Sequence, residues 1–189
     1  MSRTPSNMLA LGTTAPEFSL RDAVSGKLVG LKNSENTKAT VIMFICNHCP
    51  FVKHVNKELT RLANDYMKKG IKFIAINSND IRNYPDDSPE NMKINATKES
   101  YPFPYLFDET QEVAIAYQAA CTPDFYVFDK SLLLIYRGQL DDSRPGNNIP
   151  VTGSSIRNVL DCVLANEAVN PEQKPSLGCN IKWNEENSF

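Results

Sequence analysis

Thr-Val-Ile-Met-Phe-Ile-Cys-Asn-His-Cys-Pro-Phe-Val, residues 40–52, determines the architecture of this chain. Its first six residues are an apolar, partly β-branched run, which is typical of a strand covered on both faces. From Phe51, apolar residues recur at spacings of 4, 4, 3 and 4, and this pattern predicts an amphipathic helix that ends at Gly70. The pair Cys46 and Cys49 falls where the predicted strand gives way to the predicted helix.

The next segment completes a strand–helix–strand unit. Residues 71–77, Ile-Lys-Phe-Ile-Ala-Ile-Asn, predict a second buried strand. Two strands joined by one helix over about 40 residues form a parallel pair with a right-handed crossover. The chain is therefore an α/β protein.

Weaker patterns extend this unit in both directions. We predict hairpins over residues 18–29 and 125–137, a polar loop over 79–88, and helices that begin at Pro89 and near Ile156. Asp108 and Gln111 resemble a capping box for a short helix to Tyr117. From Asn166 the sequence is a polar tail.

Composition excludes several classes of partner. The chain has 189 residues, of which 41% are hydrophobic and 22% charged, as in one ordinary globular domain. A net charge of −2 removes the electrostatic basis for binding nucleic acid or an anionic membrane. We expect neither partner. The sequence does not indicate the oligomeric state.

The cysteine count argues against a secreted disulfide scaffold. Five cysteines cannot all pair within one chain. Residues 1–11 lack the apolar core of a secretory signal, and no segment approaches the length of a membrane span. We therefore expect a cytoplasmic protein.

Position gives Cys46 and Cys49 their chemistry. Unpaired N–H groups and the helix dipole stabilise an anion at a helix N-terminus, and a thiolate is the anion available there. Thiols two residues apart can close a disulfide and so exchange two electrons with a partner. An imidazolium at His48 would favour the thiolate and make the disulfide more oxidising, whereas a cytoplasmic location favours a reductant. The redox direction stays open.

Several motifs resemble those of the thioredoxin-fold redoxins, the alkyl hydroperoxide reductase and thiol-specific antioxidant superfamily. The closest resemblance is to a peroxiredoxin-like group of mostly uncharacterised proteins and covers residues 9–183. The motifs that carry it are Gly12-x-x-Ala15-Pro16-x-Phe18-x-Leu20, residues 46–52, 83–92, 103–108 and 137–146, Thr122-Pro123, and Gly178-Cys-Asn-Ile-Lys-Trp183.

The resemblance implies a thioredoxin-like three-layer α/β/α sandwich with a central mixed β-sheet. Residues 1–165 would form the redoxin domain, and residues 166–189 a tail packing on it or trailing from it. Pro123 would be a cis-proline facing the cysteines. By contrast with ordinary thioredoxins, Ile45 replaces the tryptophan before the first cysteine.

We predict a thiol–disulfide oxidoreductase that acts on a protein or small-molecule thiol or disulfide. Cys46, expected to be the more exposed thiol, would attack, and Cys49 would resolve the mixed disulfide. Pro123 and the backbone of Thr122 would hold the partner's chain.

The first alternative is a peroxiredoxin-like thiol peroxidase that acts on a hydroperoxide through Cys49 or Cys46. The resemblance puts Cys49 in the peroxidatic position, within a Pro-x-x-x-Thr/Ser-x-x-Cys pattern. Ile42 stands in place of its proline and Cys46 in place of its threonine. We therefore expect weak peroxidase activity.

The remaining cysteines leave further alternatives open. Cys121 and Cys179 are candidates for additional redox thiols, or they are inert, and Cys162 is expected to be a bystander. No second Cys-x-x-Cys or nearby histidine pair supports a metal site, so we expect no metal and no cofactor. A noncatalytic or metal-binding thioredoxin-fold module remains an alternative because a fold alone does not define a function.

Overall fold

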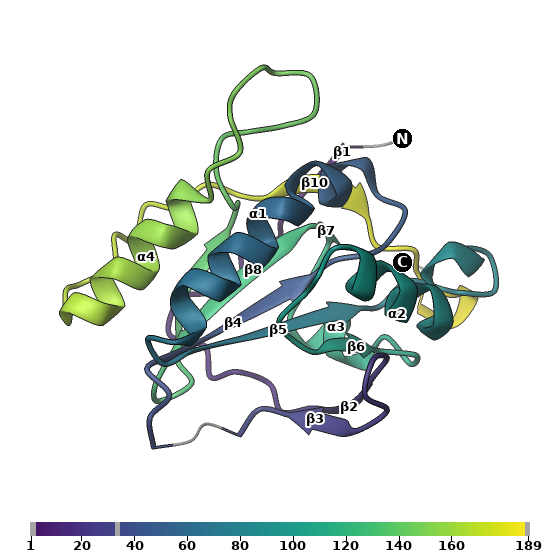
Figure 1. The fold of residues 1–189 in the computed structure, drawn as a ribbon, viewed down its shortest axis with the longest axis horizontal. Coiled ribbons are helices and arrows are strands. Elements are labelled where there is room, and N and C mark those ends of the chain that lie inside the picture. Colours follow the sequence, from purple (N-terminus) through teal and green to yellow (C-terminus); the bar gives the residue numbers. More distant parts are fainter. Residues whose placement is uncertain (1–2, 33–34, 188–189) are drawn as a thin grey trace.

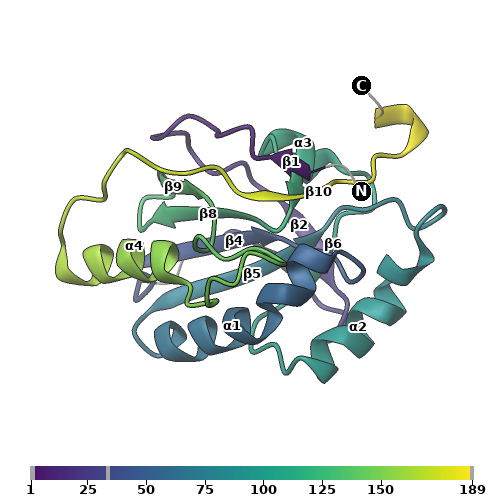
Figure 2. The ribbon, with the colours of Figure 1, turned by 90° about the horizontal axis from the view of Figure 1, so that it is seen from above.

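A seven-stranded mixed sheet forms the centre of the computed structural model, which describes residues 3–32 and 35–187. The strand order is β3-β2-β6-β5-β4-β8-β9 (Figure 1; β9 is labelled in Figure 2). The strands are β2 (Ser19–Asp22), β3 (Leu28–Gly30), β4 (Ala39–Phe44), β5 (Ile71–Asn77), β6 (Tyr105–Phe107), β8 (Asp124–Asp129) and β9 (Leu134–Gly138). In the centre, β4 pairs parallel with β5 and antiparallel with β8.

Helices cover both faces of this sheet, as the view from above shows (Figure 2). Helices α1 (Pro50–Met67), α2 (Pro89–Lys98) and α4 (Ser154–Ala165) lie on one face, and α3 (Glu112–Ala116) lies on the other. The three-layer α/β/α sandwich with a mixed sheet is therefore confirmed. In the described parts of the chain, no helix is long and apolar enough to cross a bilayer.

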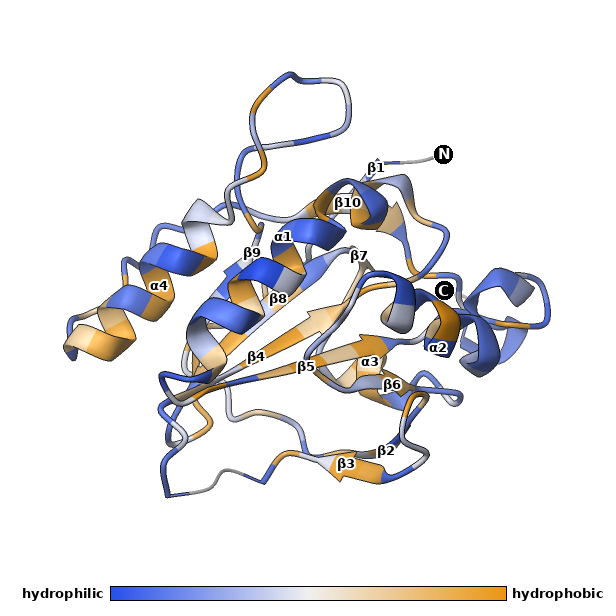
Figure 3. Ribbon diagram, in the orientation of Figure 1, coloured by the Kyte–Doolittle hydropathy of each residue, from blue (hydrophilic) through white to orange (hydrophobic). Residues whose placement is uncertain are grey.

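Strand β4 shows why the apolar run predicts a central strand. Val41 and Met43 pack in the core beneath α1, whereas Ile42 and Phe44 pack in the core on the opposite face. All six residues of the strand are buried. Figure 3 shows the same hydrophobic character along β4 and β5. Burying apolar surface on both faces stabilises a strand that a one-sided sheet would leave half exposed.

The predicted hairpins and the helices at Pro89 and near Ile156 are present. Ser88 caps α2 through its side chain, which accepts a hydrogen bond from the N–H of Asn91. Pro50 is the first residue of α1, and Cys49 is its N-cap. At the other end, Gly70 has a φ of 92°, a left-handed conformation that glycine adopts without steric cost.

Other predictions are wrong in detail. The capping box at α3 does not form, because the Gln111 side chain donates to the carbonyls of Ser78 and Lys182 instead. Asp108 caps the helix by accepting from the N–H groups of Val113 and Ala114. The loop over residues 79–88 contains a short 3₁₀ helix, η1 (Pro85–Asp87).

The tail is more ordered than its composition suggests. Strand β10 (Leu177–Asn180) lies between β1 (Arg3–Pro5) and β7 (Cys121–Thr122) in a three-stranded sheet, and a second 3₁₀ helix, η2 (Glu185–Asn187), follows it. The sequence Leu-Gly-Cys-Asn of this strand has no alternating apolar pattern, although the strand pairs antiparallel with β1 and β7 and buries Cys179.

Gly178 allows β10 to approach β7 closely. A Cβ atom at this position would lie 2.0 Å from the Thr122 carbonyl oxygen and 3.1 Å from the Pro123 nitrogen. Both neighbours are backbone atoms, so no side chain can rotate away. Any side chain at position 178 must therefore push the two strands apart.

We expect Gly178→Ala to lower the free energy of unfolding by about 1–3 kcal/mol through this clash, and to make Cys179 react faster with an alkylating agent. Gly146→Ala is the control for Cys179 reactivity, since a Cβ there meets nothing within 4 Å and its cost in stability comes from its positive φ of 85° rather than from a clash. It should leave Cys179 unreactive. Urea unfolding and mass spectrometry of alkylated protein measure both effects. Equal Cys179 reactivity in the two variants would contradict the close approach.

Candidate active site

The two cysteines of the pair meet at one residue of the neighbouring segment. Cys46 follows the end of β4, and Cys49 caps α1. The Cys46 sulfur lies 3.3 Å from Thr122 Oγ1, and the Cys49 sulfur lies 3.2 Å from the Thr122 carbonyl oxygen, to which Cys49 donates only when it is protonated. The Thr122–Pro123 peptide bond is cis. Strand β4, helix α1 and the segment that contains Thr122 and Pro123 therefore bring the two sulfur atoms close to Thr122.

Both thiols are free and buried, with residue exposures of 1% for Cys46 and 0% for Cys49. The difference in exposure expected between them is negligible, so exposure does not identify the attacking thiol. The strand–helix junction packs beneath Thr122, which is itself 3% exposed. A partner can reach either sulfur only after a local movement.

The electrostatic environment places the negative charge of the reduced pair on Cys49. A hydrogen bond from the Cys46 thiol lowers the pKa of Cys49 to about 5, against the effect of burial. Further hydrogen bonds from Cys179 and from the N–H of Val52 in the first turn of α1 stabilise the same thiolate. Donating to Cys49, together with burial and the Asp87 carboxylate, raises the pKa of Cys46.

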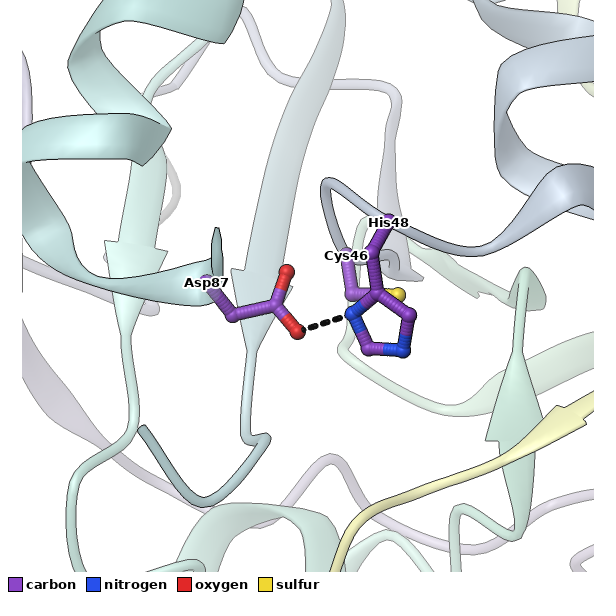
Figure 4. A group of neighbouring side chains, drawn as sticks. All are labelled: Cys46, His48 and Asp87. Carbon is purple, nitrogen blue, oxygen red and sulfur yellow. Dashed lines mark hydrogen bonds and ion pairs between the residues drawn. The ribbon is translucent and has the colours of Figure 1, made fainter. Parts of the chain in front are cut away.

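His48 forms an ion pair that the sequence does not reveal. Its Nδ1 lies 2.6 Å from Oδ2 of Asp87, which is completely buried (Figure 4). The hydrogen bond to Asp87 raises the pKa of His48, against burial. The imidazole also stacks on Tyr84, with ring centroids 5.5 Å apart. His48 is thus an imidazolium over a wider pH range than a free histidine.

Asp87 organises the loop that carries the pair. It accepts hydrogen bonds from the N–H of Asn47 and the side-chain amide of Asn79, both at 2.7 Å. Although burial raises its pKa, the bonds from His48, Asn79 and Asn47 outweigh burial and hold that pKa below its usual value. Residues 83–92 contribute to the family resemblance, but a pattern does not show that Asp87 turns inward.

Strand β10 occupies the position expected for a partner's chain. Thr122 pairs with Cys179 of β10 in an antiparallel register. Ser176, just before this strand, donates its hydroxyl to the Pro123 carbonyl oxygen. The chain's own tail therefore already pairs with the Thr122 backbone, which we expected from the sequence to hold a partner's chain.

The other cysteines differ in their relation to the pair. Cys179 hydrogen-bonds Cys49 through its thiol and its backbone N–H. Cys121 is buried, and its thiol donates to the Pro123 carbonyl oxygen at 3.7 Å. Burial raises the pKa of Cys121, and burial with the hydrogen bond to Cys49 raises the pKa of Cys179 to about 12, so both are thiols rather than thiolates while Cys49 is reduced. Cys162 lies on α4 and is half-buried.

Three groups of the kind that bind metals gather at the site. One ligand atom each from Cys46, His48 and Asp87 lies within 4.8 Å of the others. Sulfur, imidazole and carboxylate together would suit zinc. A metal bound through Nδ1 would have to break the 2.6 Å contact between His48 and Asp87.

We expect the reduced protein to form one thiolate near pH 5, because Cys49 has a pKa of about 5. Ultraviolet absorbance of the thiolate against pH measures it. Cys49→Ser should lose this transition, whereas Cys162→Ser should keep it. If the transition remained in Cys49→Ser, the charge would lie on another sulfur.

A mixed sheet with helices on both faces, and a Cys-x-x-Cys pair at the start of α1 beside a cis-proline, define a thioredoxin-fold redox protein. The chain belongs to the AhpC/TSA family, which matches residues 11–137. None of the curated proteins matches this sequence at a significant level.

Solved structures share this fold. An uncharacterized conserved protein from Geobacillus kaustophilus is 63% identical, with a TM-score of 0.95 and coverage of 98% of both chains. A hypothetical protein from Sinorhizobium meliloti is 44% identical, with a TM-score of 0.93, over 96% of this chain and 99% of that one. The thioredoxin domain of a thiol-disulfide oxidoreductase from Bacteroides vulgatus is 17% identical, with a TM-score of 0.61, over 80% of this chain and 99% of that one. This last likeness shows the fold alone.

Proposed function

We propose that this protein is a thiol–disulfide oxidoreductase that exchanges disulfides through Cys46 and Cys49, with Cys49 as the attacking thiolate. The observation that carries the proposal is the convergence of hydrogen bonds on Cys49 at the N-cap of α1. A thiolate is the nucleophile of disulfide exchange. This order reverses the one expected from sequence, in which Cys46 attacks.

The reaction needs no group beyond the pair. The Cys49 thiolate attacks one sulfur of the partner's disulfide, which breaks, and the other partner sulfur leaves as a thiolate. That thiolate takes the proton of Cys46. Cys46 then attacks Cys49, forming the Cys46–Cys49 disulfide and releasing the second partner sulfur. The partner's disulfide is reduced and the cysteine pair is oxidised, and the reverse sequence oxidises a partner dithiol.

His48 and Asp87 act on Cys46. The hydrogen bond to Cys49, burial and the Asp87 carboxylate all raise the pKa of Cys46, so the proton stays on Cys46 until the partner's sulfur leaves. The imidazolium of His48 balances that carboxylate and limits the repulsion once Cys46 becomes a thiolate. Together they set when Cys46 becomes nucleophilic.

Reduction of insulin disulfides in the presence of dithiothreitol tests the proposal. The protein should accelerate insulin precipitation well above dithiothreitol alone. The double variant Cys46→Ser/Cys49→Ser should show no acceleration, and Cys162→Ser should retain the full rate. Equal rates for the protein and for the double variant would overturn the proposal.

A peroxidase is the second candidate, since the family match and a Cys49 pKa of about 5 both favour a peroxide-reactive thiolate. Ile42 and Cys46 stand where a peroxidase pattern has proline and threonine, and neither side chain can orient a peroxide oxygen as a hydroxyl would. We therefore expect hydrogen peroxide to be consumed about as fast as by a free thiol at the same pH. A much faster reaction, lost in Cys49→Ser, would favour the peroxidase.

A further inference from the structure

Cys49 has two thiol neighbours rather than one. The Cys46 thiol donates to it from the preceding turn. The Cys179 side chain comes from β10, 130 residues further along the chain, and packs in the same buried cluster as Cys49. All three side chains belong to one buried cluster, and none is more than 1% exposed. The pair is therefore the core of a three-thiol group.

The position of Cys179 is firmly fixed. It pairs with Thr122, whose carbonyl oxygen lies 3.2 Å from the Cys49 sulfur. The close contact of Gly178 with Thr122 and the anchoring of Ser176 to Pro123 hold both sides of this position. Beyond β10, Lys182 is tied through its carbonyl oxygen to the N–H of Asp80 at 2.8 Å. The tail thus holds the Cys179 thiol against Cys49.

From this juxtaposition we propose that Cys179 is a second resolving thiol, which forms a disulfide with Cys49 in competition with Cys46. The inference rests on the proposed function, because a disulfide at Cys49 must first arise by exchange with a partner. Strand β10 then acts as a built-in substrate strand. It lies on the edge where a partner's chain would lie and presents its own cysteine.

The chemistry balances without an added reagent. Starting from the Cys46–Cys49 disulfide, the Cys179 sulfur loses its proton and attacks Cys49. A Cys49–Cys179 bond forms, the Cys46–Cys49 bond breaks, and the electron pair leaves on Cys46, which takes up a proton. No net oxidation occurs. Starting from a mixed disulfide at Cys49, the same attack releases the partner's sulfur as a thiolate.

This exchange would change how the tail is held. In the reduced state, hydrogen bonds connect β10 to β7 and to Cys49. A Cys49–Cys179 bond would add a covalent link between the start of α1 and β10. It would also leave Cys46 free as a thiol. Cys121 is no candidate for this role, since its thiol bonds the Pro123 carbonyl oxygen instead of a sulfur.

Oxidation of the Cys46→Ser variant tests the inference, with Cys46→Ala in parallel in case the serine is poorly accommodated. Reduced protein is treated with diamide, free thiols are alkylated, and intact mass gives their number. Of the four cysteines that remain, we expect two to be lost as one intramolecular disulfide. Cys46→Ser/Cys162→Ser should also lose two thiols, whereas Cys46→Ser/Cys179→Ser should lose none.

Two results would overturn the inference. In the first, folded Cys46→Ser and Cys46→Ala both keep all their thiols after diamide treatment. In the second, Cys46→Ser and Cys46→Ser/Cys179→Ser lose the same number of thiols. Circular dichroism establishes folding. Insulin reduction by the wild type reports the proposed function separately. If insulin is reduced but no bond to Cys179 forms, only the inference fails. If the bond forms but insulin is not reduced, only the proposed function fails.

Discussion

Cys49→Ser should reduce insulin disulfides no faster than dithiothreitol alone, a fall of at least roughly 1,000-fold in the protein's own contribution, as expected when a nucleophile is removed. Hydrogen bonds from Cys46, Cys179 and Val52 all converge on this one sulfur. Serine is nearly the same size, but its hydroxyl does not ionise at neutral pH. Insulin precipitation measures the rate, and Cys162→Ser is the control. Activity retained in folded Cys49→Ser would contradict the account.

Trapping separates the two orders of attack. If Cys49 attacks, Cys46→Ser/Cys179→Ser should accumulate a mixed disulfide with the partner, because neither resolving thiol remains. Cys49→Ser should accumulate none. The order expected from sequence, with Cys46 attacking, gives the opposite pattern. Non-reducing electrophoresis after mixing with a disulfide-bonded substrate distinguishes them.

Asp87→Asn should lower the free energy of unfolding by about 3–5 kcal/mol, the usual cost of breaking a buried ion pair from one side. Asp87 is completely buried and accepts from His48, Asn47 and Asn79. An asparagine amide has only one acceptor oxygen, so at least one of these three donors loses its hydrogen-bond acceptor. Asp86→Asn is the matched control. It is the exposed neighbour, and its substitution should cost less than about 0.5 kcal/mol.

The loss of unfolding free energy caused by Asp87→Asn should depend on pH. The pKa of Asp87 is lowered from 3.8, so its contribution is present above pH 3.8 and is lost as pH falls through the folded-state value. The pKa of His48 is raised from 6.5, so its contribution is complete below pH 6.5 and is lost as pH rises through the folded-state value. The ion pair therefore stabilises the protein most between these limits. Urea unfolding should show that Asp87→Asn destabilises the protein more at pH 5 than at pH 9. Equal destabilisation at the two pH values would contradict the ion pair.

The sequence predicts the centre of the fold well because its signals there are local. An apolar run from Thr40 to Ile45 can be buried on both faces only in the middle of a sheet, and the helix after Pro50 shows a clear apolar stripe. The position of Cys46 and Cys49 at the junction of these elements follows directly. The nearest neighbours of the two sulfurs do not.

Long-range contacts explain what could not be predicted. Asp87 is one acidic residue in a polar loop, and only the fold turns it toward His48. Strand β10 has little apolar patterning, so its pairing with Thr122, and with it the place of Cys179, depends on tertiary structure. The position of Cys49 as the N-cap of α1 is the basis on which we propose the reverse of the expected roles of the two cysteines.

A redox titration of the wild-type protein in glutathione buffers tests the central claim most directly. Alkylation and intact mass give the number of free thiols at each potential. The account predicts one two-electron transition that removes two of the five cysteine thiols and disappears in Cys49→Ser. If all five thiols remained free across the whole series, or if the transition survived without Cys49, the exchange mechanism would be wrong.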